Sequence, residues 1–416
     1  MQKKKVIIVG GGLAGLSAAY ELSKEERFDI HLIEKVSHLG GRVQSCMING
    51  QTIDVGGFLV YPWYTHYHKL IRALNLTDEL IKIPSVRDYY AGNEKSYDKY
   101  DEGFELSFKD IVEIFIHIFP NPLTDSDPTE PELHAYHDLT IQDYLRSLNL
   151  DAGKTNTYLR AFDTYLQGYC YGPITEHKMA FMAATLFQNI FHGDVHAASY
   201  LRNGSTVFID ALHTELEKRG VKVYFNCMLK EIGDKKLVTS TGNMDADYFI
   251  FCYTPEEVRY SKFITATVSY SGTAVVKGDA EWGSCFYKEN PDKKFPILSI
   301  VNLGKLYTEK ASNFLNLNIK VNDINPITIS SADLLDIIKA EMEEHFKDIK
   351  ILEIANRVDW ENAMPIASEN FIESKRSGQG LNNIYYAGDF MGCPSMETAL
   401  LNGKRAAEKL IKDLDD

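Results

Sequence analysis

Residues 6–34 read VIIVGGGLAGLSAAYELSKEERFDIHLIE, and this stretch decides the fold of the chain. Its first four residues form a short, wholly apolar run, which is typical of a parallel strand buried on both faces. Glycines follow at once, and residues 16–24 predict a helix with small residues on the side that faces the sheet. A second apolar run at 29–33 ends on Glu34. This succession of strand, glycine turn, helix and strand predicts an α/β fold around a parallel sheet.

The glycines of this stretch match the pattern GxGxxG, and each position has a physical reason. Gly10 allows the tight turn from strand to helix, Gly12 lets the backbone touch a pyrophosphate, and Gly15 lets the helix lie close to the strand. The start of the helix, with Leu13 and Ala14, offers N–H groups and a positive dipole end to that anion. The pattern therefore predicts a dinucleotide-binding site.

The acidic residue at the end of the second predicted strand marks the ribose end of this site. Glu34 lies 19 residues after Gly15, and a carboxylate at this distance accepts hydrogen bonds from ribose hydroxyls. Lys35 follows it, and we include both residues in the predicted cofactor site. Because an acid at this position disfavours a 2′-phosphate, we do not expect the site to take NADP.

Composition and charge are those of an ordinary globular protein of two or three domains, with 416 residues, 44% of them hydrophobic. The net charge of −14 argues against a nucleic-acid partner. The six cysteines are scattered without metal-ligand spacing, so we expect reduced thiols, no metal and a cytoplasmic protein. No stretch approaches the roughly 18 apolar residues that span a bilayer. We expect no transmembrane segment, although peripheral contact with a membrane stays open.

A second group of motifs follows the predicted dinucleotide unit. Residues 38–45, HLGGRVQS, resemble the second FAD motif, RxGGRxx[ST], of the superfamily of flavin amine oxidases and phytoene desaturases, with His38 in place of the first Arg. The resemblance implies that Gly40 and Gly41 let the chain pass close to FAD and that Arg42 offers a charged fork near the diphosphate. Residues 53–57, IDVGG, resemble the D-x-G segment beside the flavin, although a plain turn would also explain them. We include their last two residues, Gly56 and Gly57, in the predicted site.

The C-terminal residues carry further motifs of the same superfamily. Residues 383–389, NIYYAGD, predict a strand that ends on Gly388 and Asp389, and the resemblance implies that this aspartate binds the ribityl chain or pyrophosphate side of FAD. Residues 395–407 resemble SxExAxxSGxxAA, and residues 360–365 resemble WxxAxP on the substrate side of the flavin. A helix that begins near Met396 would aim the N–H groups of its first turn at the negative charge of reduced flavin. The residues implied there are Met396, Glu397 and Thr398.

The resemblance also implies the organisation of the chain. It predicts an α/β protein with a discontinuous Rossmann-type FAD-binding domain and an inserted mixed α+β substrate domain. We predict the FAD-binding domain from residues 1–80, 196–262 and 372–416, and the substrate domain from residues 81–195 and 263–371. In the middle FAD-binding segment, backbone near Leu229 would bind adenine.

The substrate segments resemble the superfamily less closely, and several features there stay open. Glu113 and His117 are one helical turn apart, but no further metal ligands are evident, so we predict a core helix at 111–119, with a lipid-docking surface as the alternative. The proline-rich stretch 120–132 predicts a loop, and the aromatic stretch 162–171 fits either core or pocket. Lys277 is the one candidate for the lysine that many amine oxidases place near flavin N5, and its alignment is poor. The catalytic residues therefore stay unknown.

Three hypotheses about function follow. The first is an FAD-dependent oxidoreductase, similar to desaturases and dehydrogenases, that passes hydride from a hydrophobic organic substrate to flavin N5. The second is an amine oxidase in the strict sense, and the third is a flavin-binding protein without catalysis. The covalent-flavin cysteine pattern of monoamine oxidases is absent and Cys393 has a different spacing, so we expect noncovalent FAD. The sequence leaves open the substrate and the electron acceptor, O2 or quinone.

Overall fold

A computed structural model describes residues 3–83, 87–91, 131–168, 172–180, 198–233, 235–275, 282–287, 293–307, 313–321, 327–346, 348–366 and 369–416. The predictions for Glu113, His117 and Lys277 lie outside these residues, as do the stretch 120–130 and the last three aromatic-stretch residues, 169–171.

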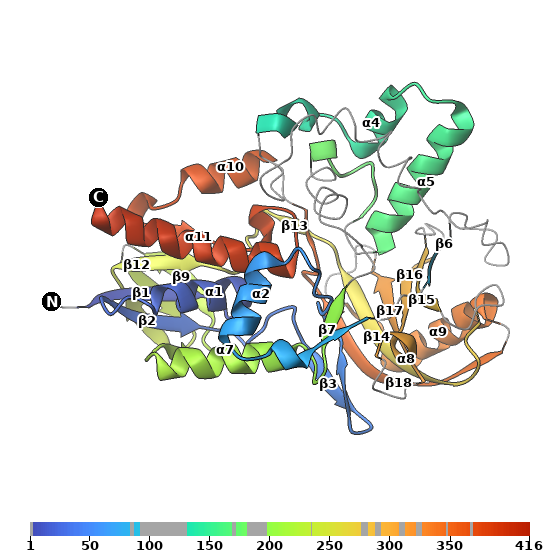
Figure 1. The fold of residues 1–416 in the computed structure, drawn as a ribbon, viewed down its shortest axis with the longest axis horizontal. Helices are drawn as coiled ribbons and strands as arrows, with labels where there is room; N and C mark the ends of the chain where they lie inside the picture. The colour runs from blue at the N-terminus through green and yellow to red at the C-terminus, as the bar shows by residue number, and fades with distance from the viewer. Residues whose placement is uncertain are drawn as a thin grey trace.

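A five-stranded parallel sheet is the centre of one half of the molecule (Figure 1). Its order is β20 (Ile384–Tyr386), β12 (Tyr248–Phe251), β1 (Lys4–Val9), β2 (Phe28–Ile33) and β8 (Lys222–Tyr224), and every neighbouring pair is parallel. The residues of β1 from Val6 to Val9 are at most 5% exposed. This confirms the predicted α/β fold with a parallel sheet at its core.

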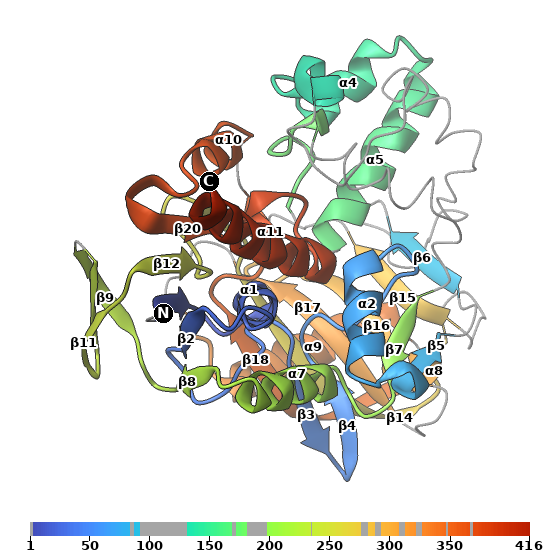
Figure 2. The same ribbon diagram turned by 60° about the vertical axis from the view of Figure 1, so that its left-hand side comes forward.

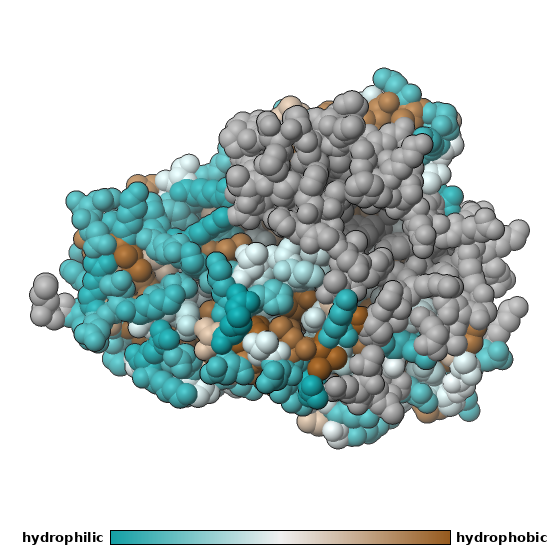
Figure 3. Space-filling model, in the orientation of Figure 1, coloured by the Kyte–Doolittle hydropathy of each residue, from teal (hydrophilic) through white to brown (hydrophobic). Residues whose placement is uncertain are grey.

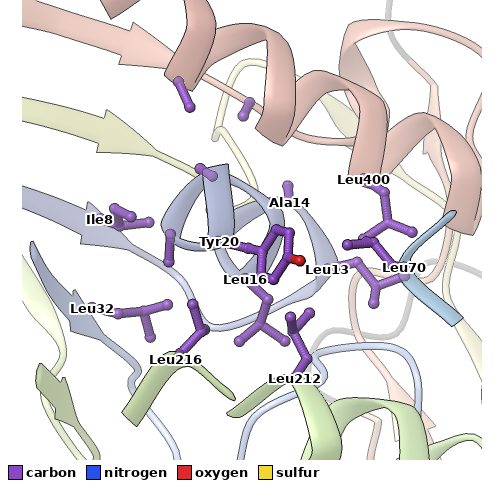
Figure 4. Close-up of a cluster of buried hydrophobic side chains, with 14 of the residues drawn as sticks. Ile8, Leu13, Ala14, Leu16, Tyr20, Leu32, Leu70, Leu212, Leu216 and Leu400 are labelled. Carbon is purple, nitrogen blue, oxygen red and sulfur yellow. The ribbon is translucent and has the colours of Figure 1, made fainter. Parts of the chain in front are cut away.

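Helix α1 (Leu13–Leu22) lies between α11 (Met396–Asp415), which crosses above it, and α7 (Thr206–Lys218), which lies below it (Figure 2). Figure 4 shows Leu16 of α1 beside Leu212 of α7, and Leu13 near Leu400 of α11 and Leu70 of α2 (Thr65–Ala73). The contact with α11 requires Gly403, because a Cβ there would overlap the carbonyl oxygen of Ala14. Small residues therefore bring the first and last helices of this half together.

A six-stranded sheet is the centre of the other half, in the order β18 (Ile349–Trp360), β14 (Phe263–Gly272), β17 (Phe314–Lys320), β16 (Ile297–Asn302), β15 (Trp282–Tyr287) and β6 (Arg87–Ala91). Its pairs are antiparallel, except that β15 and β6 are parallel. Helix α9 (Ser331–His345) covers one face, where Leu334, Ile338 and Met342 join a buried cluster with residues of β14 and β17. The side chain of Ser330 caps this helix by accepting from Asp333 N at 3.1 Å.

The two sheets draw on different parts of the chain. Every strand of the parallel sheet comes from residues 1–80, 196–262 or 372–416, and every strand of the six-stranded sheet comes from residues 81–195 or 263–371. The domain boundaries themselves stay a prediction.

The remaining described elements are short strands and peripheral helices. The strands are β3 (Ser45–Ile48), β4 (Gln51–Asp54), β5 (Leu80–Lys82), β7 (Ser199–Leu201), β9 (Leu229–Gly233), β10 (Lys236–Thr239), β11 (Gly242–Asp245), β13 (Arg259–Tyr260) and β19 (Pro365–Ile366). The α-helices are α4 (Ile141–Ser147), α5 (Ala152–Gly168), α8 (Leu303–Leu306) and α10 (Glu369–Ser377). The 3-10 turns are η1 (Thr77–Glu79), η2 (Pro131–Tyr136), η3 (Leu381–Asn383) and η4 (Asp389–Met391).

Candidate functional site

The turn between β1 and α1 has a geometry that only glycine satisfies. Gly10 has φ +108°, and a Cβ there would lie 2.8 Å from the carbonyl oxygen of Cys252. A Cβ at Gly15 would collide with the carbonyl oxygen of Gly10. Helix α1 begins at Leu13, and its cap residue Gly12 has no side chain to satisfy the first N–H groups. Those groups are therefore placed to meet an anion.

The predicted second glycine motif lies directly against this turn. Gly40 N donates to Gly11 O at 2.9 Å, and Gly12 and Gly40 form an isolated bridge. Gly41 has φ +59°, and a Cβ there would lie 3.3 Å from Gly12 Cα. Two stretches of side-chain-free backbone, about thirty residues apart in the sequence, thus form one surface that a flat or phosphate-bearing ligand can approach.

Glu34 supports the glycine turn as well as offering a ribose contact. Its carboxylate is 8% exposed, accepts from Gly11 N at 2.7 Å through Oε2, and accepts from Val36 N at 3.1 Å through Oε1. A carboxylate has about four acceptor positions, so capacity for hydroxyl donors remains. The contact with Gly11 was not foreseen from the sequence, because GxGxxG assigns no role to that position.

The residues around Glu34 connect it to the predicted adenine contact. Cys227 N donates to Glu34 O at 2.8 Å, and Leu229 follows two residues later at the start of β9. Lys35 is exposed beside them. The structure therefore brings the predicted adenine and ribose residues to one end of the parallel sheet.

Arg42 and Asp389, predicted separately, form an ion pair with each other. Arg42 Nη2 donates to Asp389 Oδ1 at 2.6 Å, and Nη1 donates to Ala363 O at 2.8 Å. Burial acts to lower the pKa of Arg42, but the charge and hydrogen bond of Asp389 outweigh it and raise that pKa. The guanidinium thus joins three distant segments, including the one predicted to lie on the substrate side of the flavin.

Tyr260 is a residue of this cluster that the sequence analysis missed. Its hydroxyl is buried and has no hydrogen-bond partner among the described residues. Burial and the neighbouring charge of Asp389 raise its pKa, although Arg42 opposes the change. Buried hydroxyls are nearly always paired, so this one is explained most simply by a partner from a bound group. No sequence signal marks a lone tyrosine in a two-residue strand.

The start of α11 lies beside the third glycine segment. A Cβ at Gly56 would collide with the carbonyl oxygen of Arg42, and one at Gly57 would lie 3.5 Å from Met396 Cγ. Ser395 Oγ caps the helix by accepting from Thr398 N at 3.0 Å. Gly388 joins Asp389 to the end of β20. Gly57, Met396, Thr398 and the capping Ser395 thus lie together at the N-terminus of α11.

The side chain of Glu397 serves a different purpose from the one expected of a cofactor residue. Its carboxylate accepts from His66 N at 2.7 Å, Tyr67 N at 2.9 Å and Thr65 Oγ1 at 3.2 Å, all in the first turn of α2. A negative charge at this position satisfies helix N–H groups and favours the helix dipole. Its contribution to a cofactor would therefore come from its backbone.

Asp54, which begins the D-x-G segment, is 1% exposed and is surrounded by donors. Its carboxylate accepts from Ser45 Oγ at 2.7 Å, Ser205 N at 2.7 Å and Tyr307 OH at 2.8 Å. Burial, followed by the charge of Asp54, raises the pKa of Tyr307. Because Tyr307 follows α8 and Ser205 precedes α7, this carboxylate connects the two halves of the molecule.

The face of the six-stranded sheet opposite α9 is polar where β14 and β17 pair. Thr265 lies across from Asn318, and Thr267 lies across from Asn316. Their side chains are hydrogen-bonded at 3.0 Å and 2.6 Å. Asn316 Nδ2 also donates to Asp54 O at 2.9 Å, so this polar face is directed towards the glycine segments.

The polar face continues sideways across the sheet. Trp360 Nε1 donates to Thr265 Oγ1 at 2.9 Å, and Asn318 Nδ2 donates to Ser299 Oγ at 3.0 Å. These groups are uncharged donors and acceptors. The sheet therefore presents neutral hydrogen-bonding chemistry on the side where the predicted cofactor residues gather.

An apolar layer lies near the same region. Cys393 is 5% exposed and belongs to a buried cluster with Ile141 and Leu145 of α4 and Tyr158 and Phe162 of α5. The aromatic stretch is therefore core at Phe162. Within the described ranges, the five cysteines are thiols outside any disulfide bond.

Within the described ranges, no group of three or more His, Cys, Asp or Glu side chains is arranged to hold a metal ion. No helix in that same part of the chain combines the length and apolar character needed to cross a bilayer.

Comparison with known proteins identifies the family to which this chain belongs. Residues 13–276 match the model of the family described as flavin containing amine oxidoreductase. The chain is 45% identical over 64 residues to a 4,4'-diaponeurosporene oxygenase of Staphylococcus haemolyticus, covering 15% of this chain and 12% of the relative. It is 33% identical over 159 residues to a probable flavin-containing monoamine oxidase A of Dictyostelium discoideum, covering 34% of this chain and 32% of the relative. The matches thus span at most a third of these two relatives.

Solved structures share the fold over the whole chain. The crystal structure of a CLA-producing fatty acid isomerase from P. acnes superposes with a TM-score of 0.73 at 14% sequence identity, covering 98% of both chains. At this identity the likeness establishes the fold alone.

Proposed function

We propose that this chain, which belongs to the flavin containing amine oxidoreductase family, is an FAD-dependent enzyme that oxidises a hydrophobic organic substrate by hydride transfer to N5 of noncovalently bound FAD. The observation that carries this proposal is the convergence of three glycine segments, the Arg42–Asp389 ion pair and the start of α11 in one place. The family description, flavin containing amine oxidoreductase, favours an enzyme over a flavin-binding protein without catalysis.

The residues present fit FAD along its length. We assign the adenosine end to Glu34, Lys35 and backbone at Leu229, where β2 and β9 come together. The pyrophosphate end is assigned to the first turn of α1, where N–H groups lack a side-chain cap. The rest of FAD, from the diphosphate and the ribityl chain to the ring, is assigned to the group Gly40, Gly41, Arg42, Gly56, Gly57, Gly388, Asp389, Met396, Glu397 and Thr398.

The packing of Cys393 supports a flavin that is not covalently linked. The start of α11 supports stabilisation of the reduced form of that flavin. The thiol of Cys393 is packed among apolar side chains of α4 and α5, which is a setting for a structural cysteine rather than a tether. FAD supplies the hydride acceptor, so the residues around it need only bind, orient and exclude water. The dipole of α11 and the first-turn N–H groups favour the negative charge that reduction places on the ring.

The apolar cluster that contains Cys393 supports a hydrophobic substrate. Its side chains come from η2, α4, α5, residues 174–180 and, through Cys393, the segment just after η4, so an apolar layer adjoins the residues assigned to the flavin. Burial of apolar substrate surface against such a layer would supply most of the binding energy. On this basis we place the chain nearer to desaturase-type members than to amine oxidases.

The polar face of β14 and β17 favours the second candidate, an amine oxidase in the strict sense. Thr265, Thr267, Asn316 and Asn318 could orient a neutral amine by hydrogen bonds, because none of them carries a charge. An alternative role for the same face is to hold the single polar end of a hydrophobic substrate.

An anaerobic titration distinguishes the candidates. The purified protein should show flavin bands near roughly 370 and 450 nm that are released on denaturation. Bleaching by an isoprenoid or long-chain substrate, with no response to alkyl amines, would support the proposed function. Bleaching by amines alone would replace it with the alternative. A protein that cannot take up FAD would overturn both.

The cofactor assignment has its own test. Arg42→Gln removes the charge that pairs with Asp389, and we expect FAD affinity to fall by roughly tenfold or more. Arg259→Gln is the matched control. It also removes an arginine charge, but Arg259 is exposed and pairs with Glu176 instead of Asp389. Arg259 directly precedes Tyr260 in the sequence. Equal FAD affinity in the two variants would argue against the assignment of Arg42 to the cofactor site.

A further inference from the structure

Four side chains on the polar face of the six-stranded sheet form a chain of hydrogen bonds that begins at Trp360. Its Nε1 donates to Thr265 Oγ1 at 2.9 Å, and Thr265 Oγ1 donates to Asn318 Oδ1 at 3.0 Å. Asn318 Nδ2 in turn donates to Ser299 Oγ at 3.0 Å. The four residues come from β18, β14, β17 and β16 (Figure 1), and we call them the Trp360 relay.

The direction of the Trp360 relay is fixed at its first member. An indole N–H can only donate, so Thr265 accepts from it and directs its own hydroxyl proton to Asn318 Oδ1. The neighbouring pair has the same direction for an independent reason. Asn316 Nδ2 donates to Asp54 O, which can only accept, so Asn316 Oδ1 is the atom that faces Thr267. Both asparagines therefore receive a threonine proton through their oxygen.

The other end of the Trp360 relay consequently presents donors. Ser299 Oγ accepts from Asn318, and its O–H meets no acceptor among the described residues. Ser299 is 1% exposed, and buried polar groups are nearly always paired. Asn318 Nδ2 has a second N–H that likewise meets no acceptor in this part of the chain, and Asn318 is only partly buried. A ligand that reaches Asn318 therefore meets two hydrogen-bond donors.

The Trp360 relay lies beside residues assigned to the flavin. Trp360 packs in an apolar cluster with Phe263, Leu298 and Ala363. The carbonyl oxygen of Ala363 accepts from Arg42 Nη1 at 2.8 Å, and Arg42 also pairs with Asp389 through its other terminal nitrogen. Apolar side chains thus separate two donors from the assigned cofactor residues, an arrangement that suits an apolar molecule with one polar end.

We propose that the donors at Asn318 and Ser299 bind a carbonyl oxygen of the substrate and select oxygen-bearing substrates over amines. This inference rests on the proposed function and specifies its substrate class. A carbonyl oxygen has two acceptor positions and no donor, so it can take both hydrogen bonds. Ketones, esters and carboxylic acids share this oxygen.

An amine matches the same donors poorly. An alkylammonium ion has only donors, so it would leave the N–H of Asn318 and the O–H of Ser299 unpaired and would lose hydration as well. The neutral amine has a single lone pair, and with a pKa close to that of lysine, about 10.4, it is scarce at neutral pH. The direction of the hydrogen bonds therefore favours the polar end of a hydrophobic substrate over an amine.

Three probes with the same alkyl chain test this preference: octan-2-one, octanoate and octylamine. Each is titrated anaerobically into flavin-loaded protein at pH 7.5, and binding is followed by the absorbance of the oxidised flavin. We expect the tighter-binding carbonyl probe to bind about tenfold more tightly than octylamine. Which carbonyl probe binds more tightly tells whether the group is neutral or charged. Figure 3 shows a mostly hydrophilic surface around α10 and the end of α11, so an alkyl chain finds little to bind there.

Variants locate the preference. Asn318→Asp replaces the amide donor by an acceptor and keeps an oxygen for Thr265, so carbonyl probes should bind about tenfold more weakly and octylamine more tightly. Asn313→Asp is the matched control, because it makes the same change at an exposed asparagine directly before β17. Ser299→Ala removes one donor without adding a charge and should weaken carbonyl binding several-fold, which keeps the test available if Asn318→Asp does not fold.

Two results would overturn the inference. One is octylamine that binds as tightly as both carbonyl probes, and the other is an order of affinities that neither Asn318→Asp nor Ser299→Ala changes relative to Asn313→Asp. Both results are obtained on protein that has taken up FAD. A protein that takes up no FAD would instead contradict the proposed function, so the two failures are distinguishable.

Discussion

The two sheets differ in which of their faces are buried against apolar side chains. This difference decides which chemical groups each half of the molecule can offer to a ligand. The parallel sheet is covered by α1, α7 and α11 on one side and by a separate apolar cluster on the other. Most buried positions of its strands are apolar, so its chemistry is confined largely to backbone groups and to residues at its carboxyl edge. The six-stranded sheet packs one apolar face against α9, and where β14 and β17 pair its opposite face carries Thr265, Thr267, Asn316 and Asn318.

This contrast predicts where substitutions have the greatest effect. In the parallel half, function depends on close approach of backbones, so an added methyl group is more harmful than a lost hydrogen bond. In the six-stranded half, the polar face is a network of paired side chains, so the loss of a partner is the greater harm. The predictions below test this contrast, starting with the largest expected effect.

Gly403→Ala should destabilise the protein most, by about 3 kcal/mol or more, because the new Cβ overlaps Ala14 O and forces α11 away from α1. Urea unfolding followed by circular dichroism measures the change. Gly233→Ala is the control, because its Cβ would meet only Lys236 O at 3.5 Å. Similar unfolding midpoints for the two variants would contradict close packing at Gly403.

Asp54→Asn tests the junction between the halves. The carboxylate of Asp54 binds three donors, and the substitution replaces one of its acceptor oxygens by an amide nitrogen. This change should lower the free energy of unfolding by about 2 kcal/mol. Asp247→Asn, where the carboxylate accepts from Lys5 N at 2.8 Å, is the single-donor comparison and should cost less. If Asp247→Asn lost more unfolding free energy than Asp54→Asn, the carboxylate at the junction would matter less to stability than we expect.

His66 should make the parallel half sensitive to acid. Burial lowers its pKa from 6.5 to about 4, with Glu21 opposing the shift and Lys404, Lys69 and Lys24 adding to it. The imidazole of His66 is therefore protonated near pH 6.5 in the unfolded chain, but only near pH 4 in the folded chain. Its stabilising contribution is complete above pH 6.5 and falls as the pH decreases, by about 2 kcal/mol at pH 5.

Unfolding free energies at pH 7.5 and pH 5 measure this effect. The variant His66→Gln should show a smaller loss between the two pH values than the parent protein. An unchanged loss in the variant would assign the acid sensitivity to other groups.

Tyr260→Phe should have the smallest effect, and its pattern is more informative than its size. The hydroxyl is buried without a partner in the described part of the chain, so its removal should leave the unfolding free energy of the flavin-free protein unchanged or slightly higher. FAD affinity should fall several-fold, by about 1 kcal/mol, because a donor to the bound cofactor is lost. Loss of apo-protein stability with full FAD affinity would give the hydroxyl a structural role instead.

Much of the parallel half could be predicted from the sequence. The apolar run at 6–9, the glycines of GxGxxG and the strand ending at Glu34 all depend on neighbours in the chain, and they are observed as β1, the turn before α1 and β2. The helix beginning at Met396 was also predicted and is observed as α11, capped by Ser395. Thr140 before α4 has a residue type that favours a helix N-cap, and it accepts from Asp143 N at 3.1 Å.

The partners of several predicted residues could not be found in this way. Arg42 and Asp389 are 347 positions apart, and Glu397 binds the first turn of α2 at a separation of 331 positions from His66. A motif assigns a residue type to a position, but it does not tell which distant donor meets it. The register of β14 and β17, which places threonines opposite asparagines, is likewise set by pairing between remote strands.

By itself, the sequence determined the local devices of this protein: a glycine turn, a capped helix and an acid at the end of a strand. Each depends on backbone geometry within a few residues, where the amino acid type restricts the conformation directly. Tertiary structure alone decided the junction at Asp54 and the burial of the Tyr260 hydroxyl, which has no partner among the described residues. These features exist only where segments far apart in the chain are brought together, because charge, burial and hydrogen bonding depend on distance in space rather than on position in the sequence.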